Sequence, residues 1–176
     1  ENHPISFKWI TEAMKKGADV ISVDPRFTRT SAKATFYTAL RSGTDIAFLG
    51  GMIKYILENN QYFKEYVAAY TNASFIVADT YNFNGGLFSG FDAETRKYNR
   101  KLWGFVTDEN GNPKKDPTFQ DPRCVLQLLK RHYSRYDPKT VSDITGTPED
   151  ELLKVYEMVA ATGQKDKAGT IMYAMG

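Results

Sequence analysis

The chain has 176 residues, of which 41% are hydrophobic and 25% are charged, a balance typical of a globular domain with its own core. The formal net charge of +2 is too small to indicate a nucleic-acid partner or an acidic membrane surface. The single cysteine excludes an internal disulfide, and the two distant histidines exclude a His-based metal motif. The longest apolar stretch, 46–57, contains Lys54 and is too short to cross a bilayer, so direct membrane insertion is not expected.

The two ends suggest that the sequence is part of a larger protein. It begins with Glu-Asn-His-Pro, without an initiator Met or a signal-like segment. It ends on 170–176, which has the pattern of a strand followed by the start of a loop. We therefore expect a fragment, and motifs that it lacks can lie elsewhere.

The first part of the chain predicts alternating helices and short apolar strands. A helix over 4–16 begins at Pro4, a favoured first helical residue, and ends at Gly17. The β-branched run that follows is typical of a parallel strand covered on both faces. The further predicted elements are a strand at 18–23, an apolar segment at 35–40, and helices at 45–58 and 61–70. In the helix at 45–58, the predicted apolar face is Ile46, Leu49, Ile53, Ile56 and Leu57.

The pattern then becomes irregular and later returns to helix and strand. Residues 71–120 are rich in Gly, Asn, Asp and aromatics, and the turn Asp108-Glu109-Asn110-Gly111-Asn112-Pro113 predicts a hairpin over 103–117. Asp121-Pro122 is interpreted as the N-cap and first residue of a helix with an apolar stripe. This order of elements predicts an α/β domain with a parallel sheet, interrupted by a turn-rich insertion. The expected segments are 1–70, the insertion 71–120, and the return to the domain at 121–176. The apolar stripe of the helix at 121 consists of Val125, Leu128, Leu129, His132 and Tyr133. A last helix is expected to start at 147–150 and end at Gly163, followed by a last strand at 168–174.

Asp24-Pro25-Arg26 follows the first predicted strand and has two interpretations. Asp-Pro is common turn chemistry, which would make the tripeptide a surface turn. Alternatively, it is a ligand site, because ligands of parallel α/β sheets bind outside the carboxyl ends of strands. Asp24 would then accept hydrogen bonds from a ribose or a base, and Arg26 would pair with phosphate or stack on a purine.

Gly43-Thr44-Asp45 strengthens the ligand interpretation. Gly43 allows a ligand to approach the backbone closely, and Thr44 is expected to cap the following helix. Asp45 is favoured in a first helical turn in any case, yet its two oxygens also match the parallel N1–H and N2–H donors of guanine. Two acid-bearing loops on one sheet edge, with an arginine, predict a purine-nucleotide site.

Other chemistry is disfavoured by absent motifs. The sequence has neither the G-x-G-x-x-G fingerprint of dinucleotide-binding folds nor the P-loop motif, so ordinary NAD or ATP binding is not expected. No Ser-His-Asp set or tuned carboxylate pair is evident. Cys124 adjoins the stripe of the helix at 121, so burial is expected for it, and His132 lies on the stripe, where a packed or edge histidine is expected rather than a ligand. Two alternatives stay open: a generic purine-nucleotide-binding α/β domain, and a non-enzymatic domain that docks a partner through exposed aromatics at Tyr81, Phe83, Phe88, Phe91 and Trp103.

A family resemblance extends over nearly the whole chain. It is carried by ENHPISFKWITEAMKKGADVISVDPRFTRTSAKA and YTALRSGTDIAFLGGMIKYILENN, and by the later runs YTNASFIV, GLFSGFDAETRKY, GNPKKD, DPRCV, ITGTPEDELLKVYE and GTIMYAMG. These runs resemble the molybdopterin-guanine-dinucleotide (DMSO reductase) oxidoreductases. Within that family they resemble the large, catalytic subunits of selenocysteine-type respiratory formate dehydrogenases. The match includes the insertion, which makes it more specific than DPR and GTD alone.

The resemblance implies a fold, a reaction and a partner. The chain would be a segment of a Rossmann-like domain that holds a guanosine end of a bis-molybdopterin guanine dinucleotide cofactor. Formate would be oxidised to carbon dioxide at molybdenum or tungsten, and electrons would leave through a [4Fe–4S] cluster to an iron–sulfur beta subunit, in the periplasm. The selenocysteine, the cluster cysteines and the catalytic residues would lie outside this stretch, so the fragment alone is not expected to be active.

The resemblance also assigns cofactor-binding residues. Glu1 and Asn2 would lie near the diphosphate or a ribose, and Asp24 and Arg26 would meet the guanosine. Recognition of guanine falls to the Gly43-Thr44-Asp45 loop. The last two residues would begin a loop that lines the pterin; they are Met175 and Gly176.

Overall fold

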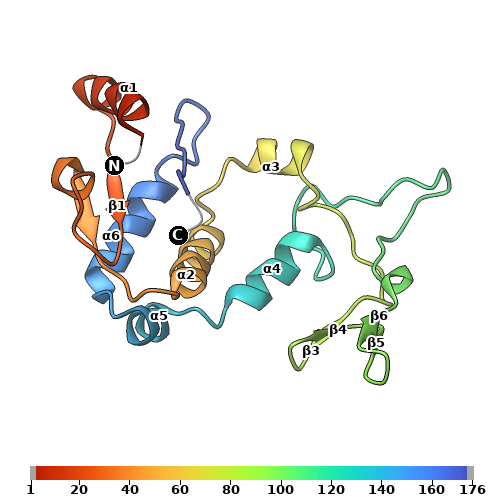
Figure 1. Cartoon of the computed structure of the whole chain (residues 1–176). Coiled ribbons are helices and arrows are strands. Elements are labelled where there is room, and N and C mark those ends of the chain that lie inside the picture. Colours follow the sequence, from red (N-terminus) through yellow and green to blue (C-terminus); the bar gives the residue numbers. More distant parts are fainter. Residues whose placement is uncertain (1–2, 174–176) are drawn as a thin grey trace. The chain divides into compact units, whose positions relative to one another are not determined.

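The computed structural model describes residues 3–173 and divides into two compact units. Unit 1 consists of the residues up to Gln61 together with those from Tyr133 onward, and unit 2 is Tyr62–His132. Unit 1 holds a parallel pair of strands and most of the helices, and unit 2 is built from turns, short hairpins and two helices (Figure 1). The predicted α/β class is confirmed.

The parallel sheet of unit 1 has two short strands, β1 (Ile21–Val23) and β2 (Phe36–Thr38), with Ile21 opposite Phe36 and Val23 opposite Thr38. A parallel pair needs a crossover of about a dozen residues, usually a helix. Here the crossover contains only the 3₁₀ helix η1 (Ser31–Lys33).

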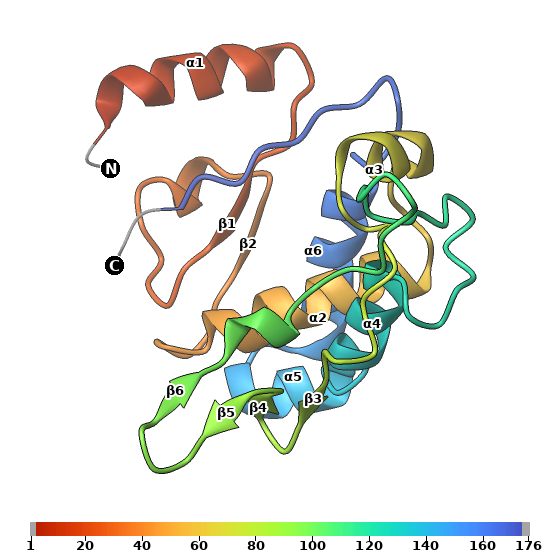
Figure 2. The same ribbon diagram turned by 90° about the vertical axis from the view of Figure 1, so that its right-hand side faces the viewer.

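Three helices build the core of unit 1. They are α2 (Asp45–Glu58), α5 (Pro138–Thr145) and α6 (Glu149–Ala160), which pack pairwise against one another (Figure 2). Their buried side chains form one cluster that also includes a residue just after β2: Leu40, Phe48, Met52, Val141, Leu152, Val155 and Tyr156. The helix α1 (Pro4–Lys15) has no buried residue; it begins with Pro4 and is followed by Gly17 at φ +93°, as predicted.

Two glycines inside α2 explain how tightly its neighbours approach. A Cβ at Gly50 would lie 2.9 Å from Cγ of Tyr136, and one at Gly51 would lie 2.5 Å from the hydroxyl of Tyr156. That hydroxyl donates a 2.9 Å hydrogen bond to the carbonyl of Phe48. Glycine lowers helix propensity, so its presence here reflects close packing.

This packing corrects the predicted face of α2. The bounds of the helix are as predicted, but Ile46 is 78% exposed and Leu49 is also exposed. The buried side of the helix is instead the glycine face, with Ala47, Phe48, Gly50, Gly51 and Met52, together with Leu57, which was predicted correctly. Ile56, also predicted, is partly buried against the same core. Close contact of Gly50 with Tyr136 and of Gly51 with Tyr156 turns this face inward and leaves Ile46 and Leu49 at the surface.

Unit 2 contains α3 (Lys64–Tyr70), α4 (Val125–Tyr133, which runs one residue into unit 1), the 3₁₀ helix η2 (Arg100–Leu102) and two antiparallel hairpins. Their strands are β3 (Phe83–Asn84) with β4 (Leu87–Phe88), and β5 (Phe91–Asp92) with β6 (Lys97–Tyr98). The hairpin predicted at 103–117 is present as a bridge between Thr107 and Pro113, closed by a 2.8 Å bond from Asp108 N to Asn112 O.

One predicted helix start differs from the structure and another is confirmed, since α6 begins at Glu149, within the predicted 147–150. Asp121-Pro122 does not begin α4, because Asp121 accepts the amide of Arg123 in a local turn and the helix starts at Val125. Leu126, outside the predicted stripe, is 3% exposed, whereas Leu129 is exposed. At α6 the N-cap is Pro148, without a side-chain cap, because Thr147 donates instead to Ala39.

The last predicted strand is wrong for its described part. Residues 168–173 have no strand assignment, and Ile171, Met172 and Tyr173 are strongly exposed. A strand exists through ladder hydrogen bonds to a neighbour. The described backbone of 168–173 makes none with β1 or β2.

Candidate functional site

Both predicted loops leave the same edge of the parallel sheet. Asp24 directly follows β1, and its amide donates a 3.3 Å hydrogen bond to the carbonyl of Thr38, the last residue of β2. Three residues after Thr38 the chain enters the turn that contains Gly43 and leads into α2. The carboxyl edge of the sheet therefore carries both acid-bearing loops, where ligands of such sheets bind.

The Asp24 loop is a tight local turn. Oδ1 of Asp24 accepts the amide of Arg26 at 2.8 Å, and Pro25 fixes the backbone between them. The hydroxyl of Tyr37 donates to the carbonyl of Asp24 at 3.0 Å, which fastens the turn to β2. Oδ2 of Asp24 accepts no hydrogen bond within residues 3–173, so the turn uses one carboxylate oxygen and leaves one for a ligand.

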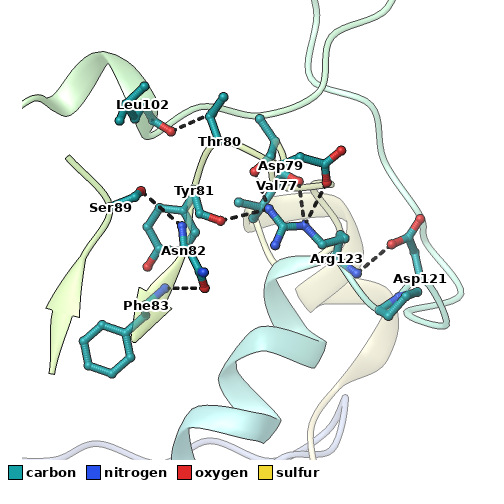
Figure 3. A network of polar contacts seen from close by, with 12 residues as sticks. Val77, Asp79, Thr80, Tyr81, Asn82, Phe83, Ser89, Leu102, Asp121 and Arg123 are labelled. Atoms are coloured by element: carbon teal, nitrogen blue, oxygen red, sulfur yellow. Dashed lines mark hydrogen bonds and ion pairs between the residues drawn. The ribbon is translucent and has the colours of Figure 1, made fainter. Parts of the chain in front are cut away.

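The chain contains the same tripeptide a second time, and that copy has a structural role. At Asp121-Pro122-Arg123 the arginine amide again donates to the aspartate, at 2.7 Å. The guanidinium of Arg123 is turned inward, and Figure 3 shows it against Val77, Tyr81 and Asp79. It also donates to the carbonyl of Ala78. The Asp-Pro-Arg turn is therefore not a ligand signal by itself, and the position of Asp24 at the sheet edge is what distinguishes the first copy.

The hydroxyl-rich stretch after Arg26 folds on itself. The Ser31 hydroxyl lies 3.0 Å from that of Ser22 in β1 and accepts the amide of Thr28 at 3.1 Å. Thr35 accepts the amide of Val20 at 3.0 Å. These bonds hold the crossover between β1 and β2 and so set where the Asp24 turn begins.

The second loop is a turn from Arg41 to Thr44. Gly43 has φ +80°, a left-handed conformation that strongly favours glycine. A Cβ at Gly43 would meet nothing within 4 Å, so the backbone conformation, rather than crowding within the chain, requires glycine here. The open space beside Gly43 permits close approach of a ligand.

Thr44 occupies the N-cap position of α2, but its side chain does not cap the helix. Its hydroxyl donates backward to the carbonyl of Arg41 at 2.6 Å, closing the turn. The predicted capping role is therefore wrong. Asp45 is the first residue of α2, is exposed, and accepts no hydrogen bond within the described residues.

Sequence reasoning missed two contributors to this edge. Phe27 and Tyr37 form an edge-to-face pair with ring centroids 5.0 Å apart, beside the Asp24 turn. Arg41 binds the end of α5 through its side chain, and only its place two residues before Gly43 in the sequence signalled it. Four predicted site residues lie outside the described residues: Glu1, Asn2, Met175 and Gly176.

The other reactive residue types have structural surroundings. Cys124 is fully buried, and burial raises the pKa of its thiol, so the expectation that it is buried is confirmed. The ring of His132 lies against Phe83, with centroids 5.2 Å apart. Within residues 3–173, no cluster of three or more His, Cys, Asp or Glu residues forms a metal site, and no helix combines the length and apolarity that crossing a bilayer requires.

Comparison with characterised sequences identifies close relatives. The chain is 62% identical to the formate dehydrogenase subunit alpha of Megalodesulfovibrio gigas and 54% identical to the formate dehydrogenase 2 subunit alpha (cytochrome c-553) of Nitratidesulfovibrio vulgaris. Both matches cover all of this chain and 17% of the relative. The chain therefore spans about one sixth of the length of these relatives. No family model matches it.

A solved structure of a known enzyme shares the fold. The acetylene hydratase from Pelobacter acetylenicus matches with a TM-score of 0.54 and 23% sequence identity. The match covers 87% of this chain and 14% of that one. At this identity the similarity concerns the fold alone.

Proposed function

The chain is homologous over its whole length to one segment of the formate dehydrogenase alpha subunits, and from this premise we propose that it holds the guanosine end of a molybdopterin guanine dinucleotide in such an enzyme. The single observation that carries the proposal is the meeting of the Asp24 turn and the Arg41–Asp45 turn at the carboxyl edge of the parallel sheet. The homology supports the type of enzyme, and the two acid-bearing turns at this edge support it as the binding place.

The donor set of the edge fits a guanosine. Asp45 offers two carboxylate oxygens to the paired N1–H and N2–H donors of guanine, and it stands at a helix start without a competing partner in the described chain. Gly43 leaves room beside the backbone for the base. Asp24 keeps Oδ2 for a ribose hydroxyl, and the exposed Arg26 carries the positive charge that suits a phosphate.

The reaction itself would depend on parts beyond this stretch. When bound, the cofactor would supply a molybdenum or tungsten centre for the two-electron oxidation of formate to carbon dioxide and a proton. The residues of this chain bind and orient the guanosine end and take no part in proton or electron transfer. A selenocysteine, a [4Fe–4S] cluster, an iron–sulfur beta subunit as electron acceptor and a periplasmic location belong to the same proposal and rest on the family resemblance.

Analysis of the released cofactor tests the proposal. The protein that carries this chain is purified under anaerobic conditions and denatured, and the supernatant is assayed for pterin fluorescence and for GMP after mild acid hydrolysis. We expect both, together with molybdenum or tungsten in elemental analysis. A folded preparation without pterin and without either metal would rule the proposal out.

A generic purine-nucleotide-binding domain is the remaining alternative from the same edge chemistry. It predicts a free nucleotide in the supernatant and no pterin, so the same assay separates the two. The partner-docking alternative also stays open. Phe88 packs against Phe83 at 5.0 Å and against Trp103 at 5.4 Å, yet Phe88 and Phe91 are exposed, so these ring contacts cover only part of the aromatic surface.

A further inference from the structure

We infer that Arg41 is the positioning residue of the guanine-recognition loop, and that it fixes Asp45 by tying the loop to the C-terminal end of α5. This inference rests on the proposed function, because it concerns how that site is held. Arg41 lies only four residues before Asp45 in the sequence, yet its own partners are about a hundred residues further along the chain.

The segment that leaves β2 is bound along the α5–α6 connection by side-chain and backbone bonds. The hydroxyl of Thr38 donates to Glu151 in α6, and the hydroxyl of Thr147 donates to the carbonyl of Ala39 at 2.6 Å. The amide of Arg41 donates to the carbonyl of Thr145 at 2.7 Å. Thr38, Thr145 and Thr147 are almost fully buried, so these bonds are protected from competition with water.

The guanidinium of Arg41 completes this attachment. Its Nη1 donates to the carbonyls of Asp143 at 2.7 Å and Ile144 at 3.0 Å. These carbonyls belong to the last turn of α5, where backbone acceptors lack helical partners and the helix dipole favours a cation. Gly146 follows at φ +74°, and a Cβ there would lie 3.2 Å from Nε of Arg41, so the glycine also makes room for the arginine side chain.

The backbone carbonyl of Arg41 holds the turn that leads into Asp45. The carbonyl of Arg41 accepts both the hydroxyl of Thr44 at 2.6 Å and the amide of Thr44 at 3.3 Å. The carbonyl of Thr44 in turn accepts the amide of Phe48 at 3.2 Å, which starts α2 at Asp45. One residue therefore joins the α5 terminus, the turn and the first residue of α2, and displacement of Arg41 moves the carboxylate that would meet guanine.

The test is a double-mutant cycle on the complete holoprotein, with GMP retention as the readout. After transfer to cofactor-free buffer, the rate at which pterin-linked GMP leaves the protein is measured for the parent, Arg41→Met, Asp45→Ala and the double variant. We expect Arg41→Met to speed the loss about tenfold, the size of one lost hydrogen bond to a charged group. In the Asp45→Ala background the same change should have almost no effect, since the residue that it positions is gone.

Two further variants separate positioning from general stability. Arg41→Lys keeps the charge but lacks the planar fork, and it should restore part of the retention. Lys139→Met breaks an exposed ion pair with Asp143 on the same helix, 2.8 Å long, and should leave retention unchanged. Val155→Ala serves as a variant with a weakened core, so that a loss of thermal stability alone can be compared with the loss in Arg41→Met.

Each outcome bears on one claim. Parent-like retention in Arg41→Met, or an equal effect of Arg41→Met with and without Asp45, overturns the positioning role of Arg41. So does a retention loss in Arg41→Met no greater than that in Val155→Ala at the same drop in melting temperature. Unchanged retention in Asp45→Ala, with GMP present in the parent, instead overturns the proposed guanine contact and the inference with it.

Discussion

The glycine face of α2 makes a strong prediction about stability. In Gly51→Ala, the new Cβ would lie 2.5 Å from the hydroxyl oxygen of Tyr156 and 3.0 Å from Cγ2 of Val141. Real Cβ atoms do not approach so closely, so something must move. Tyr156 is only 1% exposed and Val141 is fully buried, which leaves neither an easy path to relax.

Three effects set the size of the change. Overpacking a well-packed core costs about 1–3 kcal/mol. If Tyr156 shifts, its hydrogen bond to the carbonyl of Phe48 is weakened, at about 1 kcal/mol. Alanine gains about 1 kcal/mol over glycine in a helix interior. The net expectation is a loss of about 1–3 kcal/mol in the free energy of unfolding, even though the substitution raises helix propensity.

Thermal unfolding followed by circular dichroism measures this change. A loss of about 2 kcal/mol lowers the melting temperature by about 4–8 °C for a chain of this size. Gly104→Ala is the matched control, because a Cβ there meets nothing within 4 Å, and its melting temperature should stay the same or rise slightly. Equal or higher stability of Gly51→Ala would refute the view that α2 is packed through its glycines.

Two further sites give predictions about stability. Hydrogen bonds from Thr118, the amide of Asp121 and the amide of Gln120 lower the pKa of Asp116 to about 2, against about 3.9 in an unfolded chain. A group with a lowered pKa stabilises the fold above about pH 4 and loses that contribution as the pH falls through about 2. Because Oδ2 of Asp116 accepts the amides of Gln120 and Asp121, Asp116→Asn should lower the free energy of unfolding by about 1 kcal/mol at pH 6 and by almost nothing at pH 2. An equal loss at both pH values in urea titrations would contradict this. Thr147→Val should lower the free energy of unfolding by about 1–3 kcal/mol, because the carbonyl of Ala39 loses its buried donor, and a neutral result in the same titration would show that this bond does not stabilise unit 1.

Asp-Pro dipeptides illustrate what local sequence can and cannot decide. Asp137-Pro138 begins α5, with Asp137 accepting the amide of Thr140 at 3.0 Å, yet the sequence analysis did not predict this helix. The same rule was applied at Asp121-Pro122, where the aspartate closes a turn and the helix starts later. Both outcomes use one local geometry, an aspartate oxygen that accepts a nearby amide, and the tertiary partners of the following residues decide between them.

The candidate site was predictable where it depends on backbone order. A β-branched run and the Gly43 turn were enough to place Asp24 and Asp45 on one sheet edge, although residues 35–40, which form the second parallel strand, were predicted only as an apolar segment. The long-range hydrogen bonds that hold the two turns in place were not predictable from the sequence. Arg41 binds carbonyls about a hundred residues away, and no periodicity or spacing indicates a contact between segments so distant in the sequence.

The most direct measurement is an experimental structure of the complete holoprotein with its cofactor. We expect a guanine base whose N1 and N2 lie about 2.7–3.2 Å from the two carboxylate oxygens of Asp45, with the adjoining ribose at the Asp24 turn. A pterin cofactor whose guanosine ends both lie away from the Arg41–Asp45 turn would contradict it.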